Sequence, residues 1–364
     1  MYFCFAGSLR DDVLVESRFF LSYLEDGKEK IFVNKLLSNL RHNVLGYSSE
    51  NEKDRTFECV DHHEKGTCRV QNSSISLDTL LSTAAGAALQ AGRMFSVRLG
   101  TALEIREKTS LSDVVTEVDK AAEAAIRAWI EKHHPNHQVL GEEGVEPGRE
   151  AAAKAFSELA DEPHLWLVDP LDGTTNFVSG MPLSVVSIAY ASHGKVQTAC
   201  IYDPYRHEMF LAARGQGVYL AEDTAVEAWL EQPQKEFPGR RVTVSATTEL
   251  RRAVVATGMP VRIAPRLERT KRVAEVAVEA KSFRALGAAA LHLAYVAVGR
   301  IDAFWEFDLN VWDLAAGTLM VEEAGGTLIS LEANPHSLHT RDILVAGKSA
   351  LAERIYNIIQ KPFD

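Results

Sequence analysis

The sequence has little cysteine, no excess of positive charge and no long apolar run. Its four cysteines among 364 residues are too few for a disulfide framework in a chain of this length. No segment approaches the roughly 18 apolar residues of a membrane-spanning helix, and the N-terminus lacks the basic start of a signal peptide. These absences predict a protein that works in the reducing cytoplasm and does not enter a membrane.

The charge balance is acidic. Lys and Arg total 39 against 50 Asp and Glu, which gives a net charge of -11 at pH 7. Nucleic-acid backbones select basic surfaces, so a nucleic acid is not expected as the substrate. An acidic chain that handles a small anionic substrate needs local help from metal ions or helix termini.

The chain changes character near residue 75. Residues 1–75 are largely polar and aperiodic, with one candidate helix at 28–40, and we interpret them as an N-terminal appendage. Residues 76–364 alternate between helical and strand patterns, which predicts one catalytic domain with a layered α/β (α+β) fold.

Several segments of this domain have clear periodicity. SLDTLLSTAAGAALQAGRMFSVRL and VVTEVDKAAEAAIRAWIEKHHP predict helices, the second of which Pro135 ends. PLSVVSIAYASHGKVQTACIYDPYRHEMFLAARGQGVYL alternates like a meander of antiparallel strands, with ARGQGVY as a hairpin connection. WDLAAGTLMVEEAGG predicts a further helix, and IDAFWEF and TLISL predict strands.

The stretch WLVDPLDGTTNF places polar residues where a strand should turn into a helix. Pro170 favours an extended residue before it, so we expect the strand to end with Asp169 at its tip. Gly173 permits a tight turn, and a helix is expected to begin at Thr174. The free N–H groups of that first turn would suit a phosphate.

Acidic residues gather at the ends of three predicted elements. Asp169, Asp172 and the Leu171 carbonyl form the oxygen cluster that a hard divalent cation prefers. A turn with a helix cap explains the two aspartates alone equally well. Glu142 after HQVLG and Asp313 in WDLAAGTLMVEEAGG add acids at further element ends, where open α/β sheets build their sites. The combination favours a metal site.

A covalent nucleophile is not indicated. The sequence has no G-x-S-x-G elbow, and Cys200 lies in an apolar strand pattern that predicts a buried structural thiol. His133, His134 and His137 gather at a predicted helix end, where the helix dipole accounts for them.

Four motifs resemble those of the inositol monophosphatase family, whose members are magnesium-dependent, lithium-sensitive phosphatases: DPLDGTTNF, GEEG, DVVTEVD and WDLAAGTLMVEEAGG. Their order and spacing match over residues 76–350, and the nine-residue DPLDGTTNF match is highly specific. The resemblance implies a layered α-β-α-β-α sandwich of the sugar-phosphatase and inositol monophosphatase type, assembled as a homodimer. Residues 1–75 have no counterpart in the family.

The resemblance also implies a set of metal ligands. Glu142, Asp169 and the Leu171 carbonyl would bind a first magnesium ion. Asp169, Asp172 and Asp313 would bind a second, and Glu142 would also reach a third, weaker ion.

Catalytic roles follow from the same resemblance. Gly173 and Thr174 would offer N–H groups to the phosphate. Thr174 and Asp119, together with Glu142, would orient the attacking water.

The substrate-side residues are implied in the same way. Glu306 would bind a substrate hydroxyl, in a pocket that Gly287, Ala288 and Asp313 also line. Many relatives have histidine at the position of Ser179 and animal relatives have threonine at that of Ala288. These departures bear on the choice of substrate more than on the chemistry.

The implied reaction is hydrolysis of myo-inositol 1-phosphate and similar small phosphorylated polyols to alcohol and phosphate, by water activated between two metal ions. Histidinol phosphate, fructose 1,6-bisphosphate and 3'-phosphoadenosine 5'-phosphate are alternative substrates for the same chemistry. The short PLSVVSIAY segment and Glu306 favour the inositol phosphate, because larger bisphosphates would need extra basic residues. A different alternative is an adaptor role in transcription, which some bacterial relatives have.

Overall fold

The chain divides into two compact units, Met1–Ile75 and Ser76–Asp364. The computed structural model describes residues 2–10, 13–21, 55–58, 69–72, 75–101, 105–110, 113–232, 236–258, 263–332 and 334–361. The described residues of the first unit form two antiparallel strand pairs, β1 (Tyr2–Arg10) with β2 (Val13–Leu21) and β3 (Arg55–Glu58) with β4 (Arg69–Asn72). The helix expected at 28–40 lies outside the described residues.

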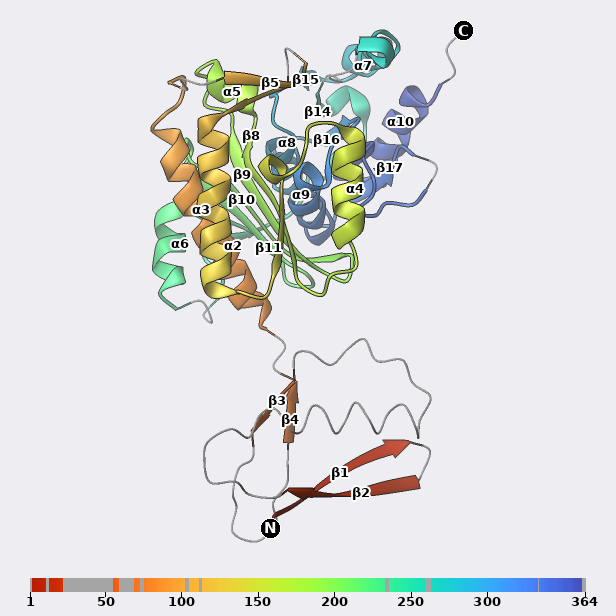
Figure 1. The fold of residues 1–364 in the computed structure, drawn as a ribbon. Helices are drawn as coiled ribbons and strands as arrows, with labels where there is room; N and C mark the ends of the chain where they lie inside the picture. Colours follow the sequence, from red (N-terminus) through yellow and green to blue (C-terminus); the bar gives the residue numbers. More distant parts are fainter. Residues whose placement is uncertain are drawn as a thin grey trace. The chain divides into compact units, whose positions relative to one another are not determined.

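A seven-stranded sheet is the larger of the two main sheets in the second unit (Figure 1). Its order is β13-β12-β11-β10-β9-β8-β7, in which β7 and β8 run parallel and the other described neighbours run antiparallel. The strands are β7 (Gln138–Gly141), β8 (Leu165–Asp172), β9 (Val185–Ser192), β10 (Lys195–Asp203), β11 (Glu208–Ala213), β12 (Gly217–Glu222) and β13 (Arg240–Val242). The expected meander is therefore confirmed, with ARGQGVY at the turn between β11 and β12.

The second main sheet has five strands in the order β15-β14-β16-β18-β17. They are β14 (Val254–Thr257), β15 (Ser282–Arg284), β16 (Ala303–Glu306), β17 (Thr327–Ser330) and β18 (Ile343–Ala346). A separate short pair, β5 (Ile105–Ser110) and β6 (Asp113–Thr116), leads into the second long helix.

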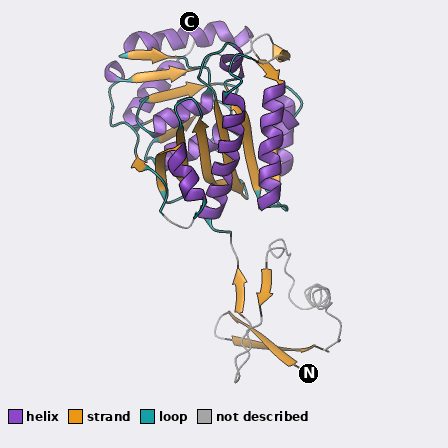
Figure 2. Ribbon diagram, turned by 90° about the vertical axis from the view of Figure 1, so that its left-hand side faces the viewer, coloured by secondary structure: helices purple, strands orange, loops and turns teal. Residues whose placement is uncertain are grey.

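Helices lie between the sheets and outside both of them, as the two views show (Figures 1 and 2). The middle layer is α8 (Ala289–Ala297) and α9 (Val311–Glu323). The seven-stranded sheet is covered on its other face by α2 (Leu77–Ser96), α3 (Glu117–His133) and α6 (Asp223–Leu230). The five-stranded sheet is covered by α7 (Ile263–Glu279) and α10 (Ser349–Ile359). The predicted α-β-α-β-α sandwich is confirmed.

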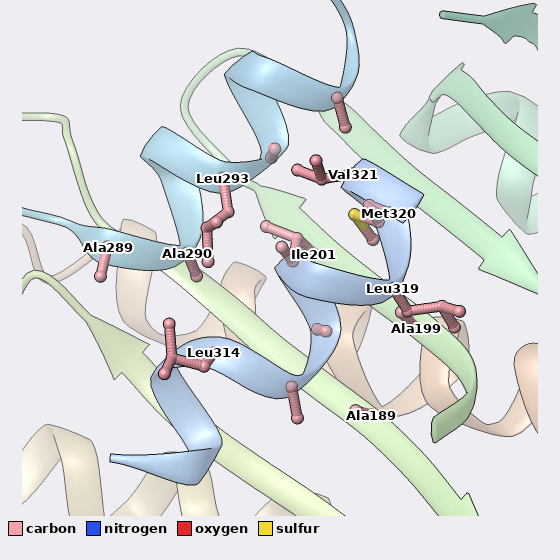
Figure 3. Close-up of a cluster of buried hydrophobic side chains, with 14 of the residues drawn as sticks. Ala189, Ala199, Ile201, Ala289, Ala290, Leu293, Leu314, Leu319, Met320 and Val321 are labelled. Carbon is pink, nitrogen blue, oxygen red and sulfur yellow. The ribbon is translucent and has the colours of Figure 1, made fainter. Parts of the chain in front are cut away.

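The middle layer is apolar on nearly all sides because both of its helices are buried between sheets. Gly317 allows α8 and α9 to approach closely, since a Cβ at this position would lie 2.3 Å from the Cβ of Leu293. Figure 3 shows side chains that meet here, among them Leu293, Leu314, Leu319 and Met320 of the helices and Ala189, Ala199 and Ile201 of the sheet. Among the described helices, none is long and apolar enough to span a bilayer.

Two expected boundaries were wrong. β8 does not end at Asp169 but continues through Pro170 to Asp172. Its pairing with β9 is irregular between Asp169 and Asp172, so the proline lies where no regular ladder bond is required of it. The second helix begins at Glu117, and the preceding VVT belongs to β6.

Candidate active site

Three acids from separate elements converge at one edge of the seven-stranded sheet. Glu142 opens the short helix η1 (Glu142–Gly144) directly after β7, Asp169 lies in β8, and Asp313 lies in the first turn of α9. β7 and β8 are parallel neighbours, with Gly141 opposite Val168, so Glu142 and Asp169 emerge side by side. One carboxylate oxygen from each of the three lies within 4.8 Å of the others.

The electrostatics of this cluster fit a divalent cation. Burial, and next the charge of Glu142, raise the pKa of Asp169 well above its usual range. The same two causes raise the pKa of Asp313. Carboxylates that repel one another in a poorly solvated place must bind either protons or a cation. Carboxylate oxygens are donors that magnesium prefers.

Asp172 stands beside this cluster and is held by a different element. Its two carboxylate oxygens accept hydrogen bonds from the N–H groups of Ala289 at 3.1 Å and Ala290 at 2.7 Å. These N–H groups belong to the first turn of α8, where helices leave them free. Burial raises the pKa of Asp172 to about 7, and its charge adds to that felt by Asp169.

Thr174 and Asp119, to which the resemblance assigns one shared role, lie within hydrogen-bonding distance. The Thr174 hydroxyl lies 2.9 Å from Asp119 Oδ1 and 3.1 Å from the Leu171 carbonyl, and can donate to either. The other oxygen of Asp119 accepts from the N–H and the hydroxyl of Thr116, at 2.9 and 2.5 Å. Asp119 is 2% exposed, and burial raises its pKa. The starts of α3 and α5 (Thr174–Val178) are thereby joined.

Gly173 is required where β8 turns into α5. Its φ of 95° lies in the left-handed region, and a Cβ would lie 2.8 Å from the Leu183 carbonyl oxygen. A Cβ would also lie 3.2 Å from that of Ala288, so the predicted phosphate loop and the predicted substrate pocket are adjacent.

Asn176 connects these two loops, a role that the sequence did not reveal. Its side-chain amide donates to the carbonyls of Leu183 at 2.9 Å and Leu286 at 2.7 Å. Gly287 follows Leu286 with a φ of 73°, and a Cβ there would lie 3.1 Å from the Asn176 amide. The only sequence signal was the place of Asn176 inside DPLDGTTNF.

Glu306 is the last residue of β16, and its carboxylate packs directly against the backbone of Gly258. A Cβ at Gly258 would lie 1.9 Å from Glu306 Oε1, so any larger residue would displace this carboxylate. Burial, and then the charges of Asp172 and Asp313, raise the pKa of Glu306 to about 8. Sequence reasoning missed Gly258, which lies in RRAVVATGMP and was assigned only to the loop after a strand.

Glu123 of α3 holds the turn that carries Glu142. Its carboxylate accepts from the Glu143 N–H at 2.7 Å and from Arg127 Nε at 2.8 Å. A Cβ at Gly141 would lie 2.4 Å from Glu123 Oε2, so this turn packs directly on the carboxylate. The helical pattern alone gave no reason to single out Glu123.

Cys200 and His134 were both predicted to lie outside the catalytic machinery, and the structure confirms the account given for Cys200 but not the one given for His134. Cys200 is a buried thiol as predicted, and burial raises its pKa. The helix-dipole account of His134 was wrong, because this ring is 6% exposed and burial lowers its pKa, which disfavours the charged form. His134 instead bonds Thr83 Oγ1 at 2.9 Å and stacks on His137 with ring centres 4.5 Å apart.

Comparison with known proteins gives consistent matches over the second unit. The sequence profile of the inositol monophosphatase family matches residues 76–362. "Nus factor SuhB" of Pseudomonas aeruginosa is 38% identical over 289 residues, which cover 78% of this chain and 97% of that protein. "Inositol-1-monophosphatase" of Rhizobium meliloti is 36% identical over 254 residues, 69% of this chain and 84% of that protein. The solved structure of extragenic suppressor protein suhB from Bartonella henselae has a TM-score of 0.65 and 33% identity, and the match covers 78% of this chain and 99% of that one.

Proposed function

Because the chain belongs to the inositol monophosphatase family, we propose that it hydrolyses myo-inositol 1-phosphate and similar small phosphomonoesters to alcohol and phosphate. The observation that carries this proposal is the convergence of Glu142, Asp169 and Asp313 beside the bonded pair of Asp119 and Thr174. A relative named inositol-1-monophosphatase supports the choice of substrate.

The acidic cluster would hold magnesium, on which this family depends. Glu142, Asp169 and the Leu171 carbonyl would provide one set of oxygens, and Asp169, Asp172 and Asp313 a second set. Glu142 would also serve a third ion. When bound, the ions supply positive charge that neutralises the phosphate and acidifies a water.

The residues of the chain would then orient the reactants. N–H groups of Gly173 and Thr174 would bind phosphate oxygens at the start of α5. When the Thr174 hydroxyl donates a hydrogen bond to Asp119 Oδ1, the threonine oxygen remains free to accept a hydrogen bond from water. Water so oriented would attack phosphorus, Glu142 would receive one of its protons, and the bond from phosphorus to the ester oxygen would break. The departing alkoxide would take up a proton from solvent and leave as the alcohol. No residue then needs to form a covalent phosphoenzyme.

The leaving alcohol would occupy the side of the site next to α8 and β16. Glu306 would bind one of its hydroxyls, and Gly287, Ala288 and Asp313 would line the same pocket. The carboxylate oxygens of Glu306 can accept hydrogen bonds from the hydroxyls of a polyol.

Substitution of the acids tests the mechanism. Asp169→Asn and Asp313→Asn remove charge with little change in shape, and each should lower kcat/KM at least about 100-fold. Asp161→Asn, at an exposed aspartate, is the matched control and should change nothing. The unsubstituted chain should lose activity in excess chelator and be inhibited by lithium. Full turnover in chelator would contradict the proposal.

A substrate panel separates the alternative substrates. We expect the highest kcat/KM with myo-inositol 1-phosphate, compared with histidinol phosphate, fructose 1,6-bisphosphate and 3'-phosphoadenosine 5'-phosphate. A clear preference for one of the others would keep the chemistry and change the substrate.

A second candidate function is an adaptor role in transcription, which the name "Nus factor SuhB" of several relatives supports. An inactive Asp169→Asn variant distinguishes the two functions. If the variant replaces the original protein in the cell without loss of growth, the adaptor role is the one the cell requires. A growth defect that parallels the loss of phosphatase activity would argue against it.

A further inference from the structure

A short salt-bridged turn lies between two residues of the candidate site. The turn spans residues 307–310, after Glu306 at the end of β16 and before Val311 at the start of α9. Asp313 follows in the first turn of that helix. The conformation of this turn therefore decides where a substrate-side carboxylate and a metal ligand are placed relative to each other.

Asp308 has an unusual backbone conformation within the turn. Its φ is 63°, in the left-handed region that residues other than glycine seldom adopt. Its N–H donates to Asp342 Oδ1 at 2.7 Å. A conformation of this kind costs free energy and persists only where neighbouring groups fix it, most often at functional sites.

Arg341 supplies contacts that fix the turn. Its guanidinium donates to Asn310 Oδ1 at 2.8 Å, and to the carbonyl and one carboxylate oxygen of Asp308, both at 3.2 Å. The side chains of Arg341 and Asp308 are only 12% and 17% exposed. The planar guanidinium can reach both residues at once because its N–H groups point in several fixed directions.

Asn310 connects the Arg341 guanidinium to Asp313 of the candidate metal site. It is the N-cap residue of α9, and its backbone N–H donates to Asp313 Oδ2 at 2.7 Å. The side chain of Asn310 is thus held by Arg341 while its backbone holds Asp313. One oxygen of Asp313 is oriented in this way before any ion binds.

Arg149 forms an ion pair between the same turn and the segment that follows Glu142 in the chain. It is the first residue of α4 (Arg149–Leu159), and its guanidinium lies 3.5 Å from Asp308 Oδ1. A small cavity of about 60 Å³ lies close to both segments. Its lining includes Glu142 and Gly148 from the segment before α4, and Asn310 and Trp312 from the start of α9. Asp308 thus bridges the segments that carry Glu142 and Asp313.

We propose that Arg341 is a positioning residue for the metal centre. Through Asn310 it orients the carboxylate of Asp313. Through Asp308 and Arg149 it maintains the spacing between the Asp313 and Glu142 segments. The inference rests on the proposed function, because it assumes a divalent cation between those acids. Removal of a residue that orients metal ligands typically weakens metal binding by about 10–100-fold.

The test compares substitutions of this turn in the full chain. Arg341→Met removes the guanidinium and keeps most of the side-chain length, while Arg341→Lys keeps the charge but not the directed donors. Arg300→Met is the matched control, because Arg300 also forms two hydrogen bonds to one acid, Glu208. The measurements are calorimetric titration with Mg²⁺, the Mg²⁺ concentration for half-maximal activity, and kcat and KM at saturating Mg²⁺.

We expect Arg341→Met to bind Mg²⁺ at least about 10-fold more weakly, with an equal rise in the half-maximal concentration. Arg341→Lys should lie between this variant and the unsubstituted chain, and Arg300→Met should match the latter. The KM for the substrate at saturating Mg²⁺ should change less than the Mg²⁺ concentration for half-maximal activity. The reason is that Arg341 contacts Asn310 and Asp308, which hold the metal ligands, and is not among the residues proposed to bind the substrate.

Unchanged Mg²⁺ binding by a folded Arg341→Met variant would overturn the inference. If that variant does not fold, Asp308→Asn decides, since asparagine tolerates the positive φ and removes only the charge. Weaker Mg²⁺ binding by Asp308→Asn supports the inference, and unchanged binding overturns it. Absence of Mg²⁺ binding by the unsubstituted chain would overturn the proposed function as well, so the two failures can be told apart.

Discussion

Backbone N–H groups orient the aspartates of the candidate site. Burial favours the protonated carboxyl, whereas an N–H hydrogen bond favours the ionised carboxylate that a metal or a water needs. Each aspartate is therefore oriented by groups that do not themselves titrate. Asp169 accepts from the Leu171 N–H at 3.0 Å, and Asp172 accepts from the N–H groups of Ala289 and Ala290 at 3.1 and 2.7 Å. Asp313 accepts from the Asn310 N–H at 2.7 Å, and Asp119 from the Thr116 N–H at 2.9 Å.

Glu123→Gln should damage the turn that carries Glu142. A neutral amide cannot accept from both Glu143 N–H and Arg127 as the carboxylate does. We expect a loss of about 1–3 kcal/mol in the free energy of unfolding, together with weaker Mg²⁺ binding. Urea unfolding and a Mg²⁺ titration measure the two effects. Glu158→Gln is the control, since Glu158 is exposed and pairs with Lys154 at 3.9 Å. Equal behaviour of the two variants would contradict the role of Glu123.

Gly173→Ala should impair both folding and phosphate binding. The positive φ alone costs a residue with a Cβ about 1–2 kcal/mol, and here the Cβ also meets the Leu183 carbonyl. The expected result is a larger loss of unfolding free energy than in the control Gly215→Ala, and at least about a 10-fold lower kcat/KM. Gly215 also has a positive φ, of 78°, but a Cβ there meets nothing within 4 Å. Similar losses in both variants would show that the space around Gly173 is unimportant.

At the scale of elements, α8 serves the site in two ways. Its first turn binds Asp172 through two N–H groups, and His292 in its second turn accepts from the Leu286 N–H at 3.0 Å. The loop with Gly287 and Ala288 is thus held at both ends by one helix. A shift of α8 would move a predicted metal ligand and the substrate pocket together.

His292 should make stability depend on pH. Burial lowers its pKa from 6.5 to about 3, so below pH 6.5 the unfolded chain binds a proton that the folded chain excludes. The contribution of neutral, buried His292 to the free energy of unfolding is fully present above pH 6.5. It falls by about 1.4 kcal/mol per pH unit below that value. The unfolding free energy should therefore drop about 1.4 kcal/mol more between pH 7.5 and 5.5 than in His292→Gln. An identical pH dependence in both proteins would contradict this account.

At the scale of the whole molecule, the second unit contains every residue of the candidate site. We expect removal of residues 1–75 to leave kcat/KM and the melting temperature of the remaining chain unchanged, because no site residue precedes Ser76. Steady-state kinetics and calorimetry of residues 76–364 check this. An inactive or unfolded truncation would show that residues 1–75 stabilise the catalytic unit.

The resemblance to a dimeric family predicts a homodimer. Light scattering after size-exclusion chromatography should give about 80 kDa, twice the chain mass of 40.1 kDa. A mass near that of one chain at micromolar concentration would contradict the prediction.

The sequence by itself determined the meander, the long helices that flank and separate the sheets near the site, and the identity of the acids. Periodicity located the meander and the long helices, and acids at element ends indicated Glu142, Asp169 and Asp313, which the structure brings together. These signals are local, because backbone preferences of proline and glycine and the spacing of apolar residues act within a few positions of the chain.

Only the tertiary structure decided what holds those acids in place. Asp172 is bound by Ala290, 118 residues away in sequence, and Glu306 rests on Gly258, across two neighbouring strands of the five-stranded sheet. The link from Arg341 to Asn310 likewise joins segments 31 residues apart. Such contacts depend on how sheets and helices stack, and many residue types would satisfy the local pattern at each position. They leave no periodic or spacing signal because the partner is chosen by packing and not by its distance along the chain.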